Sequence, residues 1–333
     1  MAFKLDARLR SDMTDAAADA QLAEQLGFDG AWSNENRGDP FLPLALAAEH
    51  TSRIDLGPSV AIAFARTPMT VAYIASDLQR YSQGRFVLGL GSQIRPHIEK
   101  RFSMPWTRPA ARMRDFVLAL RSIWATWEVG TPLSHRSEFY THTLMTPAFT
   151  PPANSYGPPK VFLAAVGPMM TRVAGEVADG LLAHPFLTER YLQEALLPEI
   201  EAGLALSGRS PDSFEVGLSA FVALDDADVE AVRRQISFYG STPAYRPVLD
   251  LHGWGDLQSD LNTLSKQGRW DDMVSLVEDE VLHAMCVVGD ATEVAVELKR
   301  RYGGLAHRIR FNRPGDVPSP AHFGDLVSAM RSD

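Results

Sequence analysis

The sequence predicts an α/β protein folded as a single (β/α)8 TIM barrel over residues 1–333, and three observations lead to this prediction. Short apolar segments alternate with amphipathic helical segments along most of the chain, which is typical of a parallel sheet whose crossovers are helices. Eight strand segments can be counted, and each except the last is followed by a helix. The run FVLGL at 86–90 is uninterrupted by polar side chains, as expected of a parallel strand covered on both faces.

The first half of the chain supplies strands one to four. They are expected at residues 3–9, 28–33, 54–64 and 86–90. A helix begins at about Thr14 and ends at Gly27, because glycine readily adopts the left-handed conformation found at helix ends. A second helix begins near Pro40. A third follows Thr67-Pro68, which combines an N-cap residue with proline at the first helical position.

The second half continues the alternation but contains two inserts. Strands are expected at 161–166, 180–183, 214–224 and 306–311, and helices at about 108–127, from 168, and at 188–206, 226–238 and 293–302. The segment 131–159 is rich in proline and is interpreted as an insert after strand four. The segment 239–285 is less regular and is interpreted as an insert after strand seven. Prolines also mark a C-terminal tail at 314–333.

An open, doubly wound sheet is the competing architecture. It is disfavoured because the G-x-G-x-x-G fingerprint of dinucleotide-binding sheets does not occur after strand one. Both architectures place their chemistry just beyond the carboxyl ends of the strands.

Composition excludes several classes of function. A net charge of -9 argues against nucleic acid and against an anionic membrane surface as partners. The single cysteine, Cys286, rules out an internal disulfide framework, and the nine histidines contain neither H-x-H nor H-E-x-x-H, so no metal site is expected. No apolar run approaches the ~18 residues of a membrane span, and the charged N-terminus is unlike a secretory signal. We therefore expect a soluble, cytoplasmic protein.

Four clusters of small or polar residues would converge at the carboxyl-end face of the barrel. They are Asn34-Glu35-Asn36, Ser59-Val60-Ala61, Gly91-Ser92-Gln93 and Gly167-Pro168-Met169-Met170. The last cluster is the most specific, because a strand followed by Gly-Pro and a helix leaves the amides of Met169, Met170 and Thr171 unpaired at a helix N-terminus. Such amides bind anions readily. An ordinary strand–helix turn is equally consistent with this local pattern.

Three other features of the sequence have both a functional and a structural interpretation. Glu35 is the only carboxylate of its cluster before Asp39 and could transfer protons, although a solvated loop glutamate looks the same in sequence. His97 could meet a phosphate or a substrate, but a lone loop histidine usually does neither. The aromatic residues of the second insert could line a pocket or a dimer contact, and core packing beneath a loop is the simpler explanation; they are Tyr239, Tyr245, Trp254 and Trp270.

Four segments carry a resemblance to a known family. They are residues 23–29 (AEQLGFD) with Trp32, 51–57 (TSRIDLG), 82–91 (SQGRFVLGLG) and 174–180 (AGEVADG). In content and order they resemble the bacterial luciferase-like family, in particular its coenzyme F420-dependent oxidoreductases, over about residues 3–312.

The resemblance implies a barrel that binds coenzyme F420, or alternatively FMN, at the carboxyl ends of its strands. It also implies a non-proline cis peptide at Ser59-Val60 behind the central ring, and backbone amides near Gly167 on the ribityl-phosphate tail. The cofactor-binding residues that it implies are Ser59, Val60, Ala61, Gly91, Ser92, Gln93, His97, Val166, Gly167, Pro168, Met169 and Met170. Relatives are often homodimers, so a homodimer acting on a small-molecule substrate is expected.

One departure from the family pattern concerns catalysis. Many relatives carry an acid–histidine pair after strand two, and the matching residues here are Glu35 and Asn36. A neutral amide cannot act as a general acid or base, so proton transfer would fall to Glu35, to water or to another residue. The expected function is hydride transfer between F420 and a small organic substrate. An FMN-dependent monooxygenase and an inactive flavin-binding barrel are the alternatives.

Overall fold

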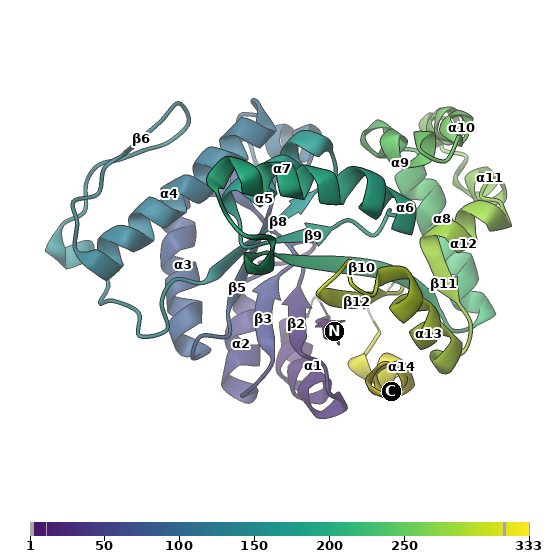
Figure 1. The fold of residues 1–333 in the computed structure, drawn as a ribbon, viewed down its shortest axis with the longest axis horizontal. Coiled ribbons are helices and arrows are strands. Elements are labelled where there is room, and N and C mark those ends of the chain that lie inside the picture. Colours follow the sequence, from purple (N-terminus) through teal and green to yellow (C-terminus); the bar gives the residue numbers. More distant parts are fainter. Residues whose placement is uncertain (1–2, 11, 316–317, 333) are drawn as a thin grey trace.

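The computed structural model describes residues 3–10, 12–315 and 318–332, and its centre is a ring of parallel strands surrounded by helices (Figure 1). Neighbouring strands follow the order β3-β2-β1-β12-β10-β9-β8-β5-β4. A parallel bridge between Leu56 of β3 and Phe86, just before β5, joins β3 to the other side of this path. The strands are β1 (Lys4–Arg8), β2 (Gly30–Ser33), β3 (Asp55–Pro58), β4 (Ala61–Ile62), β5 (Val87–Gly91), β8 (Lys160–Ala165), β9 (Gly180–Ala183), β10 (Glu215–Ala223) and β12 (Arg308–Asn312).

The predicted TIM-barrel class is confirmed, and the expected third strand is divided into two. β3 and β4 flank the Ser59-Val60 peptide bond, which is cis as the family resemblance implied. Residues 63 and 64, expected to continue this strand, belong instead to a 3₁₀ turn at Ala63–Ala65. A short strand that the sequence analysis did not expect, β11 (Cys286–Val288), pairs with the carboxyl end of β10.

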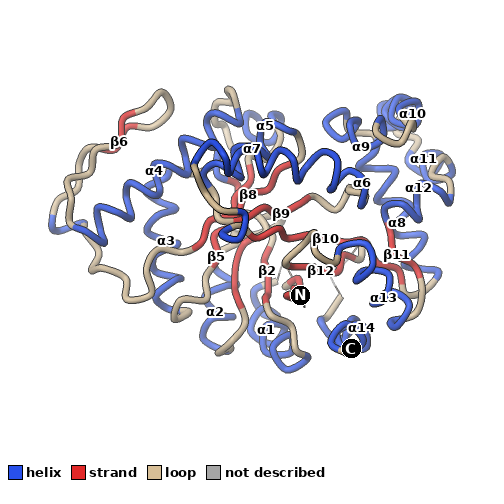
Figure 2. Tube along the Cα trace, in the orientation of Figure 1, coloured by secondary structure: helices blue, strands red, loops and turns tan. Residues whose placement is uncertain are grey.

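Helices alternate with the strands and cover the outside of the ring (Figure 2). They are α1 (Met13–Leu26), α2 (Leu42–His50), α3 (Pro68–Tyr81), α4 (Pro109–Val129), α5 (Pro168–Val177), α6 (Glu189–Tyr191), α7 (Leu197–Ser207), α8 (Asp226–Gly240) and α13 (Ala291–Tyr302). Gly27 ends α1 with a φ of 89°, and the Thr67 side chain accepts a hydrogen bond from the Thr70 amide at the start of α3. Both expected helix boundaries therefore have the capping geometry that their residue types favour. Among the described helices, none has the combination of length and apolar character needed to cross a bilayer.

The two inserts lie at opposite ends of the long axis of the molecule (Figure 1). The first carries a hairpin of β6 (His135–Arg136) and β7 (Thr141–His142). The second was expected to be irregular but is mostly helical: it contains α9 (Arg246–Asp250), α10 (Gly255–Lys266), α11 (Trp270–Ser275) and α12 (Asp279–Met285). Its prolines and glycines suggested loops, yet Pro247 lies in the first turn of α9 and Gly253 separates α9 from α10. Both residue types are favourable at helix boundaries.

The C-terminal segment also differs from the expected tail. Residues 324–331 form α14 (Gly324–Arg331), which packs beside α1 and α13 (Figure 1). Leu326, Val327 and Met330 of this helix are buried. The last strand is therefore followed by a helix like the other seven, because these apolar residues recur at helical spacing and cover the outside of the barrel.

The interior of the barrel is closed at the amino ends of the strands by buried ion pairs. Arg308 donates to both carboxylate oxygens of Asp6, over 2.9 and 2.7 Å, and to Asp55 over 2.7 Å. Its side chain is 1% exposed. Although burial alone would lower the pKa of Arg308, the charges of Asp6 and Asp55 raise it. This network fixes the floor of the barrel below the functional face.

Candidate active site

A cavity of about 570 Å³ opens at the carboxyl-end face of the barrel. It is lined by the ends of most barrel strands and by residues of α8 and the second insert. The predicted site residues that line it are Glu35, Asn36, Ser59, Val60, Gly91, Ser92, Gln93 and Val166. Three of the four predicted clusters therefore converge on one cavity, which has the size typical of small-molecule sites.

The cis peptide lies in the wall of this cavity. A Cβ atom added at Gly91 would be only 2.5 Å from Cγ2 of Val60, and one at Gly89 would be 2.0 Å from the carbonyl oxygen of Pro58. A side chain at Gly89 would therefore displace the backbone of β3, whereas one at Gly91 would displace the Val60 side chain. Ala61 is fully buried behind this wall and does not line the cavity.

Glu35 is held in an ion pair. The Arg66 guanidinium donates to its two oxygens over 2.9 and 2.7 Å, and the amide of Ile62 donates to Oε2 over 2.6 Å. The Glu35 side chain is 7% exposed. Charge-assisted bonds of this kind are strong, and they connect the end of β2 to β4 beside the cis peptide. The contacts favour a positioning role for Glu35 over transfer of its own proton.

The neighbouring asparagines differ in their surroundings. Asn36 is exposed, and its backbone carbonyl accepts a hydrogen bond from Arg101 over 3.0 Å. Asn34 is half-buried, and in the amide orientation that satisfies both sides, its nitrogen donates to the Ser59 carbonyl while its oxygen accepts from Arg8. Asn34 therefore connects the cis-peptide segment to the end of β1.

The start of α5 stands at the rim of the cavity, next to Val166. Gly167 is its N-cap, with no side chain to bond the first-turn amides, and Met169 is 75% exposed. A Cβ atom at Gly167 would meet nothing within 4 Å, so the space in front of the helix N-terminus is open. Gly167, Pro168, Met169 and Met170 are not among the residues lining the cavity itself. They form an adjoining surface with main-chain donors suited to an anion.

His97, the remaining predicted residue, is exposed at the start of the π-helical turn His97–Arg101 and does not line the cavity. Its neighbour Ile98 is fully buried and anchors this turn. The structure thus places His97 outside the described cavity wall.

An aromatic wall forms another part of the cavity lining. Of the four insert aromatics for which the sequence allowed a pocket role, Tyr239 and Tyr245 line the cavity, and Trp254 and Trp270 are not among its lining residues. His184 follows β9, and its Nδ1 accepts from the amide of Phe186 over 3.1 Å. Its Nε2 lies 3.0 Å from the Tyr245 hydroxyl. Burial, followed by the charge of Arg310, lowers the pKa of His184 to about 3, so the ring is neutral near pH 7. Because Nδ1 is an acceptor, the ring proton is assigned to Nε2, which donates to Tyr245. The Tyr245 proton is then left to point elsewhere.

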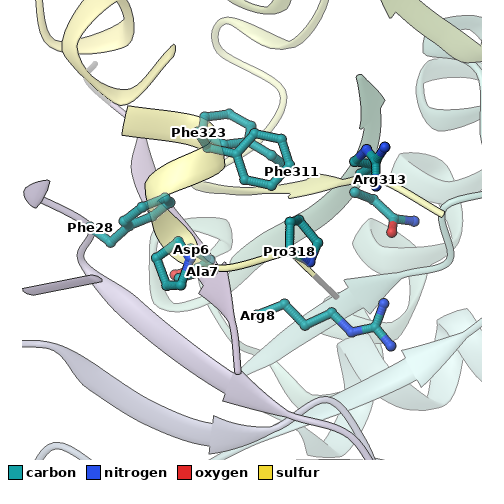
Figure 3. Close-up of a pocket in the computed structure, with 10 residues that line it drawn as sticks. Asp6, Ala7, Arg8, Phe28, Phe311, Arg313, Pro318 and Phe323 are labelled. Carbon is teal, nitrogen blue, oxygen red and sulfur yellow. The ribbon is translucent and has the colours of Figure 1, made fainter. Parts of the chain in front are cut away.

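Two arginines complete the cavity, Arg8 at the end of β1 and Arg310 on β12. Figure 3 shows the Arg8 side chain extending away from the packed rings of Phe28, Phe311 and Phe323. Burial lowers the pKa of Arg8. Burial and then repulsion from Arg8 lower the pKa of Arg310 to about 10.

These additional residues have a common signal in the sequence. Arg8, His184 and Asn312 lie at or just beyond the carboxyl ends of β1, β9 and β12, and all of them line the cavity. The same strand-end rule that selected the four clusters would have selected them. The strand-end rule does not select Tyr245, which reaches the cavity from an insert, but the pocket interpretation of the insert aromatics included it.

Comparison with known proteins identifies the family. A family model described as luciferase-like monooxygenase matches residues 4–308. The chain belongs to this luciferase-like family. An uncharacterized protein of Mycobacterium tuberculosis is 54% identical over 92% of each chain, and a putative coenzyme F420-dependent oxidoreductase of the same organism is 27% identical over 83% of this chain and 84% of its own.

Solved structures of low identity share the fold. The coenzyme F420-dependent tetrahydromethanopterin reductase from Methanopyrus kandleri has a TM-score of 0.79 at 21% identity, covering 99% of both chains. A monooxygenase component from Pseudomonas putida in complex with FMN has a TM-score of 0.63 at 15% identity, covering 96% of this chain and 90% of its own. Luciferase-like barrels described with either cofactor are thus similar to this chain in fold.

The residues at the cavity fit a flavin or deazaflavin. Because Gly91 of β5 carries no side chain, Val60 offers a surface against which a flat ring would lie. The N-terminus of α5, next to Val166, has no side-chain cap and offers main-chain donors to a phosphate. Such a cofactor needs a flat apolar surface for its ring and, next to it, hydrogen-bond donors for its phosphate.

Proposed function

We propose that this luciferase-like protein is an F420-dependent oxidoreductase that transfers a hydride between coenzyme F420 and a small organic substrate at the carboxyl-end face. The observation that carries the proposal is the cavity walled by Ser59-Val60 and Gly91 and continued by the uncapped N-terminus of α5. The relatives whose printed names include coenzyme F420 add support.

Each group of residues has a separate task in this proposal. Val60 and Gly91 support the ring, Ser92 and Gln93 follow its edge or tail, and the amides of Met169 and Met170 bind the phosphate. The cofactor supplies or accepts the hydride when it is bound. The protein orients the substrate and excludes water from the cavity.

Tyr245 is proposed to hold the proton that accompanies hydride transfer. Burial raises the pKa of its hydroxyl, so the group is protonated near pH 7. Neutral His184 donates to the Tyr245 oxygen, and the tyrosine proton is thereby available to an acceptor in the cavity. This arrangement supplies a donor that Asn36 cannot provide.

The experiment that tests the proposed function compares the two cofactors. F420 and FMN are titrated into the purified protein, and turnover is then followed by F420 absorbance with candidate substrates. We expect F420 to bind at least about tenfold more tightly than FMN. The alternative, an FMN-dependent monooxygenase, is favoured by the fold of the FMN-bound Pseudomonas structure. Tighter FMN binding with oxygen uptake would replace our proposal with that one, and F420 binding without any turnover would indicate an inactive barrel.

Tyr245→Phe should reduce turnover by roughly 100-fold and leave F420 affinity unchanged, because it removes the proton but keeps the ring. Stopped-flow rates and fluorescence titration measure the two effects. Glu35→Gln is the matched comparison: it breaks the Arg66 ion pair, so affinity and turnover should fall together. If Glu35→Gln lowers turnover alone and Tyr245→Phe changes nothing, proton transfer belongs to Glu35.

A further inference from the structure

The interior of the barrel contains arginines at two levels, and within the described chain only those at the lower level are paired with carboxylates. In the layer at the amino ends of the strands, Arg308 is surrounded by Asp6, Asp55 and Glu215. In the layer at the cavity, Arg8 and Arg310 line the same space, and burial, followed by the charge of Arg8, lowers the pKa of Arg310. Two positive charges are thus brought together where solvent is partly excluded, an arrangement that is costly unless an anion joins them.

Among the described residues that line the cavity, no carboxylate is left unpaired for these arginines. Within the described residues, Glu35 is the one acidic side chain lining the cavity, and it is paired with Arg66. Asp6 is the neighbour of Arg310 in the register of β1 and β12, and its charge acts to raise the pKa of Arg310. Both of its oxygens, however, accept hydrogen bonds from Arg308. Arg8 contacts the neutral amide of Asn34.

Arg310 has even fewer contacts. Within residues 3–10, 12–315 and 318–332, no carboxylate lies within ion-pair distance of its guanidinium and no hydrogen-bond partner is found for it. The neighbouring position on β10 is Ser219, which is paired with Arg310 in the strand register. The Ser219 hydroxyl is buried, with 5% of the residue exposed, and has no partner in the described chain. Ser219 and Arg310 both line the cavity and a small adjoining recess, which Asp6 also lines.

We propose that Arg8, Arg310 and Ser219 form an anion subsite at the floor of the cavity, and that the substrate carries a carboxylate or phosphate that binds there. The planar guanidinium groups match the oxygens of such anions, and the serine hydroxyl adds a further donor. The substrate assignment rests on the proposed function, whereas the anion subsite itself does not. This subsite is separate from the N-terminus of α5, which is reserved for the cofactor phosphate.

Anion binding is measured without cofactor, by calorimetry at constant ionic strength, with benzoate and inorganic phosphate as probes and uncharged benzamide as the comparison. We expect saturable binding of benzoate, phosphate or both, and at least about tenfold weaker binding in Arg310→Met. Ser219→Ala should weaken anion binding less than Arg310→Met does. Removal of an exposed arginine, in Arg37→Met, should have no effect.

Folding of the variants is checked by thermal denaturation. Arg310→Met should melt at the same or a higher temperature than the wild type, because it removes the repulsion with Arg8. Arg310→Lys, which retains the charge without the planar fork, should recover part of the anion affinity. Equal binding of benzoate and benzamide, or anion binding that is unchanged in Arg310→Met, would overturn the subsite.

F420 affinity of the wild type and of Arg310→Met, measured in parallel, separates the two proposals. If Arg310→Met binds F420 as the wild type does but no longer binds anions, the result supports both the proposed function and the anion subsite. A loss of F420 binding in Arg310→Met with unchanged anion binding would mean that the arginine faces the cofactor, and the subsite would be wrong. Anion binding by a protein that binds no F420 would contradict the proposed function and leave the subsite intact.

Discussion

Arg308→Met is expected to lower the free energy of unfolding by about 3–5 kcal/mol. The substitution leaves Asp6 inside the barrel without the two hydrogen bonds that Arg308 donates to it. An unpaired buried carboxylate must either remain charged in a poorly solvated environment or take up a proton, and both cost free energy. Urea denaturation at pH 7, followed by circular dichroism, measures the change.

The control for this prediction is an arginine with similar partners at the surface. Arg300 on α13 pairs with Glu297 and Glu189, and its side chain is 59% exposed. Arg300→Met should therefore change stability by less than about 1 kcal/mol. The double variant Asp6→Asn/Arg308→Met should recover part of the loss, because it removes the buried charge of Asp6 together with its partner. Equal effects of Arg308→Met and Arg300→Met would show that the buried network does not support the barrel.

Gly167→Asp is expected to weaken F420 binding by at least about tenfold, with stability unchanged or raised by a few tenths of a kcal/mol. Gly167 has φ and ψ of -101° and 163°, the extended conformation of an ordinary N-cap, and space for a side chain. An aspartate there would bond the first-turn amides that the cofactor phosphate needs and would also repel it. Fluorescence titration and thermal denaturation give the two values.

Gly167→Ala is the control that separates the charge and capping effects of an aspartate from the effect of adding a side chain. It adds a Cβ atom into open space without an acceptor, so F420 affinity should stay within about twofold of the wild type. Wild-type affinity in Gly167→Asp would place the cofactor phosphate away from α5. An equal loss in both variants would instead mean that bare backbone is required at this position.

Much of the barrel could be predicted from the sequence because its signals are local. Apolar runs such as 86–90 identify strands, and Gly27 and Thr67 mark helix boundaries through the conformations they favour. The helices of the second insert were missed because residues such as Pro247 and Gly253 make the pattern of the segment 239–285 less regular. Neighbouring buried positions such as Leu249 and Leu261 give them a helical face, which becomes apparent only when the packing partner is known.

For the site, the sequence by itself determined which strand ends meet at one face and where a helix N-terminus offers bare amides, because backbone geometry follows from short-range patterns. Only the tertiary structure decided the state of the charged groups. Glu35 is paired with Arg66 and Asp6 with Arg308, 302 positions away, while Arg310 faces the cavity without a carboxylate. The physical reason is that ion pairing depends on distance in space and on exclusion of water, and neither is encoded in the order of neighbouring residues.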